Sequence, residues 1–289
     1  MTGSHRSSLK IVECPRDAMQ GIEQFIPTKT KIDYLNQLLR VGFDILDFGS
    51  FVSPRAVPQL ADTKEVLNGL DLSQTDTELL AIVVNERGAK EACQFPQIQF
   101  LGYPFSISES FQLRNTRKTI QESFDIVKRI QMLCTNHQKT LLVYLSMGFG
   151  NPYGDPWSPE IAEFWTDQLA ALGIRHIALA DTAGVSAPDN IAQLFGSLIP
   201  RFPELRISAH FHSHPSSRDK KLQAAWEHGC RRFDTAMLGY GGCPFAEDEL
   251  VGNISTESLV YFSKKHDIRL GISQSEFQQA TILAHQVFG

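Results

Sequence analysis

The chain has 289 residues, of which 42% are hydrophobic, 20% charged and 10% aromatic, and its 27 Lys and Arg against 32 Asp and Glu give a formal net charge of −5. This balance is typical of a globular protein, and it excludes a disordered chain and a strongly basic nucleic-acid-binding protein. Residues 1–8 are too polar for a targeting peptide, and no apolar run approaches the roughly 20 residues of a membrane span.

Short apolar runs alternate with longer amphipathic segments along the chain, which is typical of βα units and a parallel sheet. The pattern predicts eight strands, at residues 9–14, 43–48, 79–84, 98–103, 141–146, 176–180, 205–212 and 232–236. Between and after them it predicts helices at residues 29–40, 116–136, 159–172, 188–198, 219–228, 256–266 and 275–287, with a less distinct helix after Asn85.

Eight strands with helical crossovers match an α/β fold, the (β/α)8 TIM barrel, here with extra C-terminal helices. An open doubly wound sheet is the alternative, but it requires a GxGxxG turn after the first strand, where this chain has Cys14-Pro15-Arg16-Asp17. We therefore predict one catalytic domain over residues 1–289. The barrel spans about 8–238, a lid loop 239–253 and the C-terminal helices 254–289.

Five cysteines, an odd number without a CxxC pair, argue against a disulfide framework. Together with the absence of a secretory leader, they predict a cytoplasmic protein. We expect neither a nucleic acid nor a membrane among its partners.

His210 and His212 lie at the end of the seventh predicted strand. Side chains alternate along a strand, so these two imidazoles point to the same face and can share a metal ion. A hydrogen-bonded pair of core histidines is the alternative. Barrel enzymes place their sites at the C-terminal ends of the strands, and this position favours the metal site.

Arg16 and Asp17 follow the first predicted strand, whose end shares the barrel mouth with that of strand seven. Asp17 can add an oxygen ligand to the imidazoles, and Arg16 can present a fixed cation to a developing oxyanion; a solvated charge pair is the alternative. Asp47 and Asp181, which end the second and sixth strands, are either further carboxylates at this rim or caps of the following helices.

A glycine-rich segment from Gly239 to Asn253 follows the last strand and carries Cys243. The glycines give hinge freedom, so the segment resembles a mobile lid with a thiol at its tip. A flexible connection with an incidental cysteine is the alternative.

Taken together, these segments resemble the 3-hydroxy-3-methylglutaryl-CoA lyases, metal-dependent TIM-barrel enzymes related to isopropylmalate and homocitrate synthases. The Gly-Gly-Cys-Pro loop followed by Gly-Asn is specific to the lyase branch, whereas the Arg-Asp and His-x-His elements are shared with the synthases. The matching stretches are Val12-Glu13-Cys14-Pro15-Arg16-Asp17, Ser50-Phe51-Val52-Ser53-Pro54, Ala209-His210-Phe211-His212, Gly241-Gly242-Cys243-Pro244, Gly252-Asn253 and Thr256-Glu257.

The resemblance implies a divalent-metal-dependent carbon–carbon lyase that cleaves 3-hydroxy-3-methylglutaryl-CoA to acetoacetate and acetyl-CoA. It also implies an acyl-CoA partner, a homodimer and a role in leucine catabolism. The implied metal ligands are Asp17, His210, His212 and Asn253. One carboxylate, one amide oxygen and two imidazoles suit Mg²⁺ or Mn²⁺ better than a closed thiolate zinc site.

The same resemblance implies roles for the remaining candidate residues. Cys243 takes part in proton transfer, and Arg16 stabilises the enolate of the departing acetyl-CoA. Asp47 is a further catalytic carboxylate, whereas Ser50 and Asp181 contact the substrate.

Two departures from the family pattern bear on the substrate. Asp47 is one methylene shorter than the usual glutamate, and Ser213-His214-Pro215 replaces the Asp-Thr that usually follows His-x-His. The alternatives are a lyase for a different 3-hydroxy-acyl-CoA, a Claisen-type synthase of the same superfamily, and a non-catalytic metal-binding barrel. The last is disfavoured because metal binding alone requires neither Arg16 nor Cys243.

Overall fold

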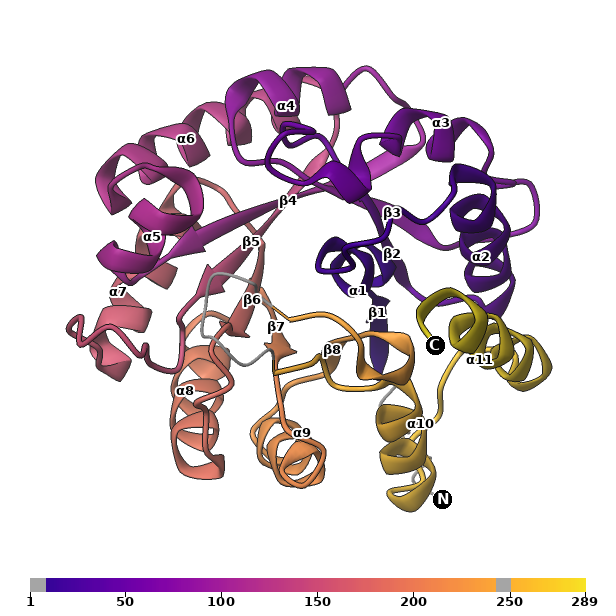
Figure 1. Ribbon diagram of the computed structural model, residues 1–289. Coiled ribbons are helices and arrows are strands. Elements are labelled where there is room, and N and C mark those ends of the chain that lie inside the picture. Colours follow the sequence, from indigo (N-terminus) through magenta and orange to yellow (C-terminus); the bar gives the residue numbers. More distant parts are fainter. Residues whose placement is uncertain (1–8, 243–250) are drawn as a thin grey trace.

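The computed structural model describes residues 9–242 and 251–289. Eight parallel strands form a closed barrel in which each strand pairs with the next and β8 returns to β1 (Figure 1). The strands are β1 (Lys10–Glu13), β2 (Ile45–Ser50), β3 (Glu78–Ile82), β4 (Ile98–Ser106), β5 (Thr140–Ser146), β6 (His176–Asp181), β7 (Arg206–Phe211) and β8 (Arg232–Thr235). The predicted TIM barrel is therefore confirmed.

Helices surround the barrel as an outer ring, whereas α1 lies in front of the strands, inside that ring (Figure 1). The helices are α1 (Pro15–Gln20), α2 (Thr28–Val41), α3 (Thr63–Asn68), α4 (Glu86–Ala92), α5 (Glu109–Thr116), α6 (Ile120–Asn136), α7 (Pro159–Ala171), α8 (Pro188–Arg201), α9 (Arg218–Glu227), α10 (Thr256–Lys265) and α11 (Gln274–Phe288). No helix in the described ranges has the length and apolarity needed to cross a membrane.

The helix predicted at residues 116–136 is present as α6, which begins later, at Ile120, and the separate helix α5, which ends at Thr116, was not predicted. The break between the two helices lies at Thr119, whose hydroxyl accepts a hydrogen bond from the Glu122 amide while the Glu122 carboxylate accepts one from the Thr119 amide. This capping box starts a new helix, because it satisfies amide groups that a continuous helix would pair internally. The six-residue helices α1 and α3 are too short to show an apolar period and were not predicted.

The barrel interior is apolar in its middle and polar at both ends. Along each strand, alternate side chains point inward, and the others pack against the helices. In β8, for example, Phe233 belongs to the outer core, so Arg232 and Asp234 point inward on either side of it. The apolar middle consists of Val12, Cys14, Ile45, Leu80, Ile82, Phe100, Leu142, Tyr144, Ala178 and Ala180.

Glu13 is a fully buried carboxyl at the seam where β1 closes onto β8. It accepts hydrogen bonds from the Met237 amide at 2.8 Å and the Thr256 hydroxyl at 2.6 Å. Burial raises its pKa from 4.5 to about 8, although these hydrogen bonds oppose the rise. Glu13 is therefore largely protonated in the folded protein at neutral pH.

This pKa predicts that the free energy of unfolding falls as the pH rises from about 4.5 to about 8, because the folded state retains a proton that the unfolded chain releases. Glu13→Gln, which cannot ionise, is expected to remove that loss, which is on the order of a few kcal/mol. Urea unfolding at pH 5, 6.5 and 8 measures it, with Glu78→Gln on the exposed start of β3 as the control. An equal loss in wild type and Glu13→Gln would assign the pH dependence to other groups.

Candidate active site

A cavity of about 180 Å³ lies at the C-terminal ends of the barrel strands. Arg16, Asp17, Ser50, His210 and His212 all line it, so the structure brings these predicted site residues together. The apolar residues that line it include Val52, Val57, Leu60, Ile82, Val84 and Phe111. The cavity therefore combines charged and apolar side chains.

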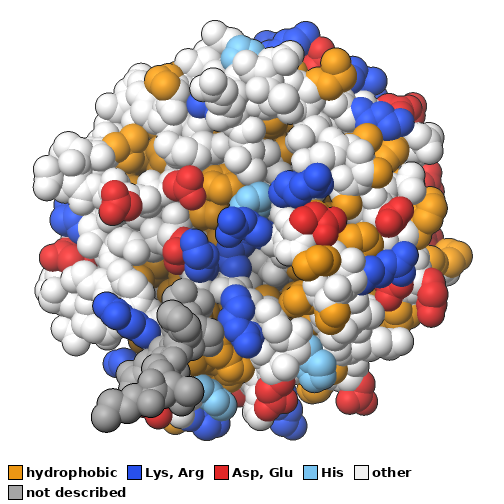
Figure 2. Space-filling model, turned by 180° about the vertical axis from the view of Figure 1, so that it is seen from behind, with side chains coloured by type: hydrophobic (Ala, Val, Ile, Leu, Met, Phe, Trp, Pro, Cys, Tyr) orange, Lys and Arg blue, Asp and Glu red, His pale blue; other side chains and the backbone are white. Residues whose placement is uncertain are grey.

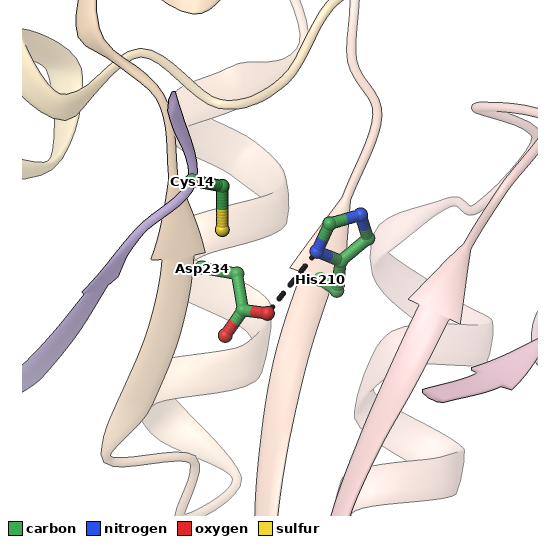
Figure 3. A group of neighbouring side chains, drawn as sticks. All are labelled: Cys14, His210 and Asp234. Carbon is green, nitrogen blue, oxygen red and sulfur yellow. Dashed lines mark hydrogen bonds and ion pairs between the residues drawn. The ribbon is translucent and has the colours of Figure 1, made fainter. Parts of the chain in front are cut away.

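Each histidine of the pair is held by a hydrogen bond at Nδ1. His210 Nδ1 lies 3.1 Å from Asp234 Oδ2 of β8 (Figure 3), and His212 Nδ1 lies 2.9 Å from the Thr182 carbonyl oxygen. With the protons on Nδ1, the Nε2 atoms are acceptors. His212 Nε2 is buried and has no hydrogen-bond partner among the described residues, as expected for a nitrogen that binds a cation.

Asp17, on α1, brings a carboxylate to the two imidazoles. Its Oδ2 lies 3.9 Å from His212 Nε2, and one potential ligand atom from each of Asp17, His210 and His212 lies within 4.8 Å of the others. Burial would raise the pKa of Asp17, but Arg16 and the two histidines lower it well below its usual range. The carboxylate is therefore ionised, which a metal ligand requires.

Asn253 completes the cluster from the chain segment after β8. Its Nδ2 donates to Asp17 Oδ2 at 2.7 Å and to the Tyr240 carbonyl at 2.9 Å, while its Oδ1 is buried without a partner in the described part of the chain. Gly241 allows this approach: its φ is +100°, and an added Cβ would collide with Asn253 Nδ2. Gly241 therefore serves close packing onto Asp17 and Asn253, in addition to any hinge.

Arg16 is anchored by Asp47, which lies in the middle of β2. The Arg16 Nε and Nη2 atoms donate to Asp47 Oδ2 at 2.9 and 2.6 Å, and Nη1 donates to Asp17 Oδ1 at 3.0 Å. Burial raises the pKa of Asp47 to about 6, although Arg16 opposes the rise. Asp47 is fully buried and is not among the residues that line the cavity.

Asp181 also lies outside the cavity lining. Its carboxylate accepts hydrogen bonds from the Ser186 hydroxyl at 2.5 Å and from Lys221 Nζ at 2.6 Å. Lys221, buried on α9, donates as well to the His212 carbonyl at 3.1 Å and so ties Asp181 to the segment that carries the second histidine. Cys243 lies outside the described residues.

Several residues of the site were not predicted. Gln20 bonds to both Arg16 and Asp17, and the Tyr144 ring contacts the His210 ring at a centroid distance of 5.2 Å. Asp234, which orients His210, was detectable in principle, because an acidic residue at an inward position of a buried strand requires a partner. The remaining unpredicted members, Asn115, Ser146 and Thr182, line the cavity.

Cys14 forms a second cluster with His210 and Asp234 (Figure 3). Burial raises the pKa of the Cys14 thiol well above its ordinary value, so the thiol remains protonated at neutral pH. Since Asp234 is engaged with His210 Nδ1, this cluster orients His210 rather than forming a thiolate metal site.

Comparisons with known proteins agree over almost the whole chain. The HMGL-like family model matches residues 9–283. The chain is 31% identical to the hydroxymethylglutaryl-CoA lyase of Bacillus subtilis (92% of this chain, 88% of that protein) and 30% identical to the (R)-citramalyl-CoA lyase of Chloroflexus aurantiacus (90% and 84%). It matches a solved HMG-CoA lyase from Acinetobacter baumannii, in complex with coenzyme A and 3-methylmalate, with a TM-score of 0.92 and 32% identity, covering 100% of this chain and 93% of that one.

Proposed function

The chain belongs to the HMGL-like family, and we propose that it is a divalent-metal-dependent carbon–carbon lyase that cleaves 3-hydroxy-3-methylglutaryl-CoA to acetoacetate and acetyl-CoA. The observation that carries the proposal is the convergence of Arg16, Asp17, His210 and His212 on one cavity at the barrel mouth. A binding protein would need the metal ligands but not the anchored arginine beside them.

The residues present fit a divalent cation. Asp17, His210, His212 and Asn253 would hold it: His212 Nε2 and Asn253 Oδ1 are buried acceptors without a described partner, and the Asp17 carboxylate is ionised. Mixed oxygen and nitrogen donors favour Mg²⁺ or Mn²⁺ over a structural zinc ion. Such a cation supplies Lewis-acid polarisation of the hydroxyl and carbonyl oxygens of the substrate.

In the proposed reaction, a base removes the proton of the C3 hydroxyl, the C2–C3 bond breaks, and acetoacetate and the enolate of acetyl-CoA form. Of the candidate bases Asp17, Asp47 and His212, only Asp17 and His212 line the cavity. The Arg16 guanidinium stabilises the enolate oxygen, and Cys243 returns a proton to its carbon.

The remaining predicted residues receive different roles in this proposal. Ser50 contacts the substrate from the cavity lining. Asp47 acts as a positioning residue, because its carboxylate accepts two hydrogen bonds from the Arg16 guanidinium. Asp181 is assigned a supporting role through Lys221 rather than a substrate contact.

Citramalyl-CoA is the second candidate substrate, because the citramalyl-CoA lyase is almost as similar to this chain as the hydroxymethylglutaryl-CoA lyase. The two acyl groups differ by one methylene between the carbinol carbon and the free carboxylate. One methylene in an apolar pocket changes kcat/KM by about 10 to 200-fold, so one substrate should clearly be preferred.

The test incubates the purified protein with each CoA thioester, first with Mg²⁺ or Mn²⁺ and then with excess EDTA. We expect acetyl-CoA and acetoacetate from 3-hydroxy-3-methylglutaryl-CoA, and we expect EDTA to abolish both. If citramalyl-CoA is cleaved to pyruvate and acetyl-CoA with the higher kcat/KM, citramalyl-CoA is the substrate instead of 3-hydroxy-3-methylglutaryl-CoA. Cleavage that persists in EDTA would contradict the metal requirement, and no cleavage of either thioester at full metal occupancy would contradict the lyase.

The homodimer, the cytoplasmic location and the role in leucine catabolism stay predictions. The acyl-CoA partner is supported by the coenzyme A in the related Acinetobacter structure.

A further inference from the structure

Arg232 is a buried cation at the end of the barrel opposite the candidate active site. It begins β8, points inward, and is 7% exposed. Its Nη1 lies 3.0 Å from His176 Nδ1, and its Nη2 donates to the Ser208 hydroxyl at 3.0 Å. Its Nε is buried and has no partner within the described ranges.

The described residues place no carboxylate in contact with this guanidinium. Its two partners are a hydroxyl and an imidazole, and residues 1–8, which the structure does not describe, include no Asp or Glu. His176 cannot carry a compensating charge: burial, together with Arg232 and Arg206, lowers its pKa to about 3, so the ring is neutral. A buried charge without a counter-ion is costly, so the arrangement calls for an anion from outside the chain.

Arg232 faces an open hollow of about 1100 Å³ at the N-terminal ends of the strands. Lys10, which lies opposite Arg232 in the β1–β8 pairing, and Arg206, which begins β7, line the same hollow. Figure 2 shows this face, with Lys and Arg side chains gathered around its centre.

The charges that line the hollow are unequal. The basic residues are Lys10, Arg40, Arg206, Arg231 and Arg232, and the acidic residues are Asp44, Asp76 and Glu78. Asp44 accepts the Ile11 amide at 2.9 Å and pairs with Lys10 Nζ at 3.6 Å, and Arg40 Nε lies 3.6 Å from a Glu276 carboxylate oxygen. The five basic and three acidic side chains that line the hollow leave a formal excess of positive charge, to which Arg206 and the buried Arg232 contribute without a carboxylate partner among the described residues.

We propose that this hollow binds an oxyanion of the phosphate class, with Arg232 as the buried contact and Lys10 and Arg206 as outer contacts. A planar guanidinium carries five N–H donors, so Nη1 and Nη2 each keep a second N–H for a tetrahedral or planar oxyanion, and the double charge of phosphate would balance more than one cation. The hollow is much larger than inorganic phosphate, so the phosphate group of a phosphorylated metabolite fits as well. No carboxylate-bearing part of the chain competes for Arg232 in the described structure.

Arg232→Met removes the charge and preserves an unbranched side chain. The thermal midpoint is measured against increasing inorganic phosphate at constant ionic strength, and titration calorimetry gives Kd. Both are run in EDTA so that phosphate cannot act through a metal ion. For wild type, we expect the thermal midpoint to rise with phosphate concentration and to saturate. For Arg232→Met, we expect a thermal midpoint in chloride at least as high as that of wild type, and a Kd for phosphate raised at least about tenfold. Arg87→Met, an exposed arginine on α4 that is not among the residues lining the hollow, should bind phosphate like wild type.

A sugar phosphate and the matching unphosphorylated sugar, titrated in parallel, distinguish a metabolite from free phosphate. Tighter binding of the sugar phosphate assigns the site to a phosphorylated metabolite, and equal binding assigns it to phosphate alone. The proposal is wrong if wild type does not respond, or if Arg232→Met responds like wild type. Should Arg232→Met not fold, Arg232→Lys and Arg206→Gln provide the same comparison. Acetyl-CoA release is measured separately, so failure of this site and failure of the lyase proposal are distinguishable.

Discussion

His212→Ala is expected to lower kcat/KM for the CoA thioester by at least about 10³-fold and to weaken Mn²⁺ binding by more than about 100-fold. The reason is the buried Nε2 of His212, which faces Asp17 at 3.9 Å and has no other described partner. Removing it takes away one of the proposed ligands. The fold should survive, because within the described residues the ring makes a single hydrogen bond, to the Thr182 carbonyl.

Mn²⁺ titration followed by calorimetry, and the acetyl-CoA assay at saturating metal, check this expectation. The matched control is His214→Ala, two residues along the chain, where the imidazole is exposed and contacts Ser216. That variant should bind Mn²⁺ and turn over substrate like wild type. Mn²⁺ binding by His212→Ala that equals wild type would remove His212 from the proposed ligand set.

Arg16→Gln is expected to lower kcat by about 10² to 10³-fold and to destabilise the protein by about 3–5 kcal/mol. Two effects combine in this variant. The enolate oxygen loses its fixed cation, and the fully buried carboxylate of Asp47 loses the partner that donates to it at 2.6 and 2.9 Å.

A double variant separates the two effects. Arg16→Gln with Asp47→Asn also removes the buried carboxyl that has lost its partner, so most of the lost stability should return while kcat stays low. Guanidinium unfolding and the lyase assay, run on the single and double variants, provide the comparison. If stability and activity recover together, Arg16 acts only through the fold, and its proposed role at the enolate is wrong.

The sequence was sufficient to predict the barrel and the histidine pair, because both rest on short-range periodicity. Eight apolar runs with helical segments between them leave few topologies, and alternation along β7 places His210 and His212 on one face. Helix α1, which carries Arg16 and Asp17, was not predicted, because its six residues, beginning with Pro15, are too few to show a helical period of apolar residues.

The directions of Asp47 and Asp181 required the structure. Asp181 ends β6, whereas Asp47 lies within β2. Ala180 faces the interior, so Asp181 alternates outward and meets Lys221. The outward direction of Asp181 could therefore have been predicted from the alternation of side chains along the strand. Asp47 points inward like Ile45 yet lies too deep to reach the cavity, and its depth depends on the stagger between strands, which no local pattern encodes.

The order of the strands also has a consequence for biosynthesis. β1 pairs with β8, and Asn253, which donates to Asp17, comes after β8. A ribosome that adds about 5 to 20 residues per second therefore leaves one edge of β1 unpaired for many seconds. Throughout that time the nascent chain carries Asp17 and then the histidine pair without Asn253, so the complete constellation can assemble only after Asn253 has left the ribosome.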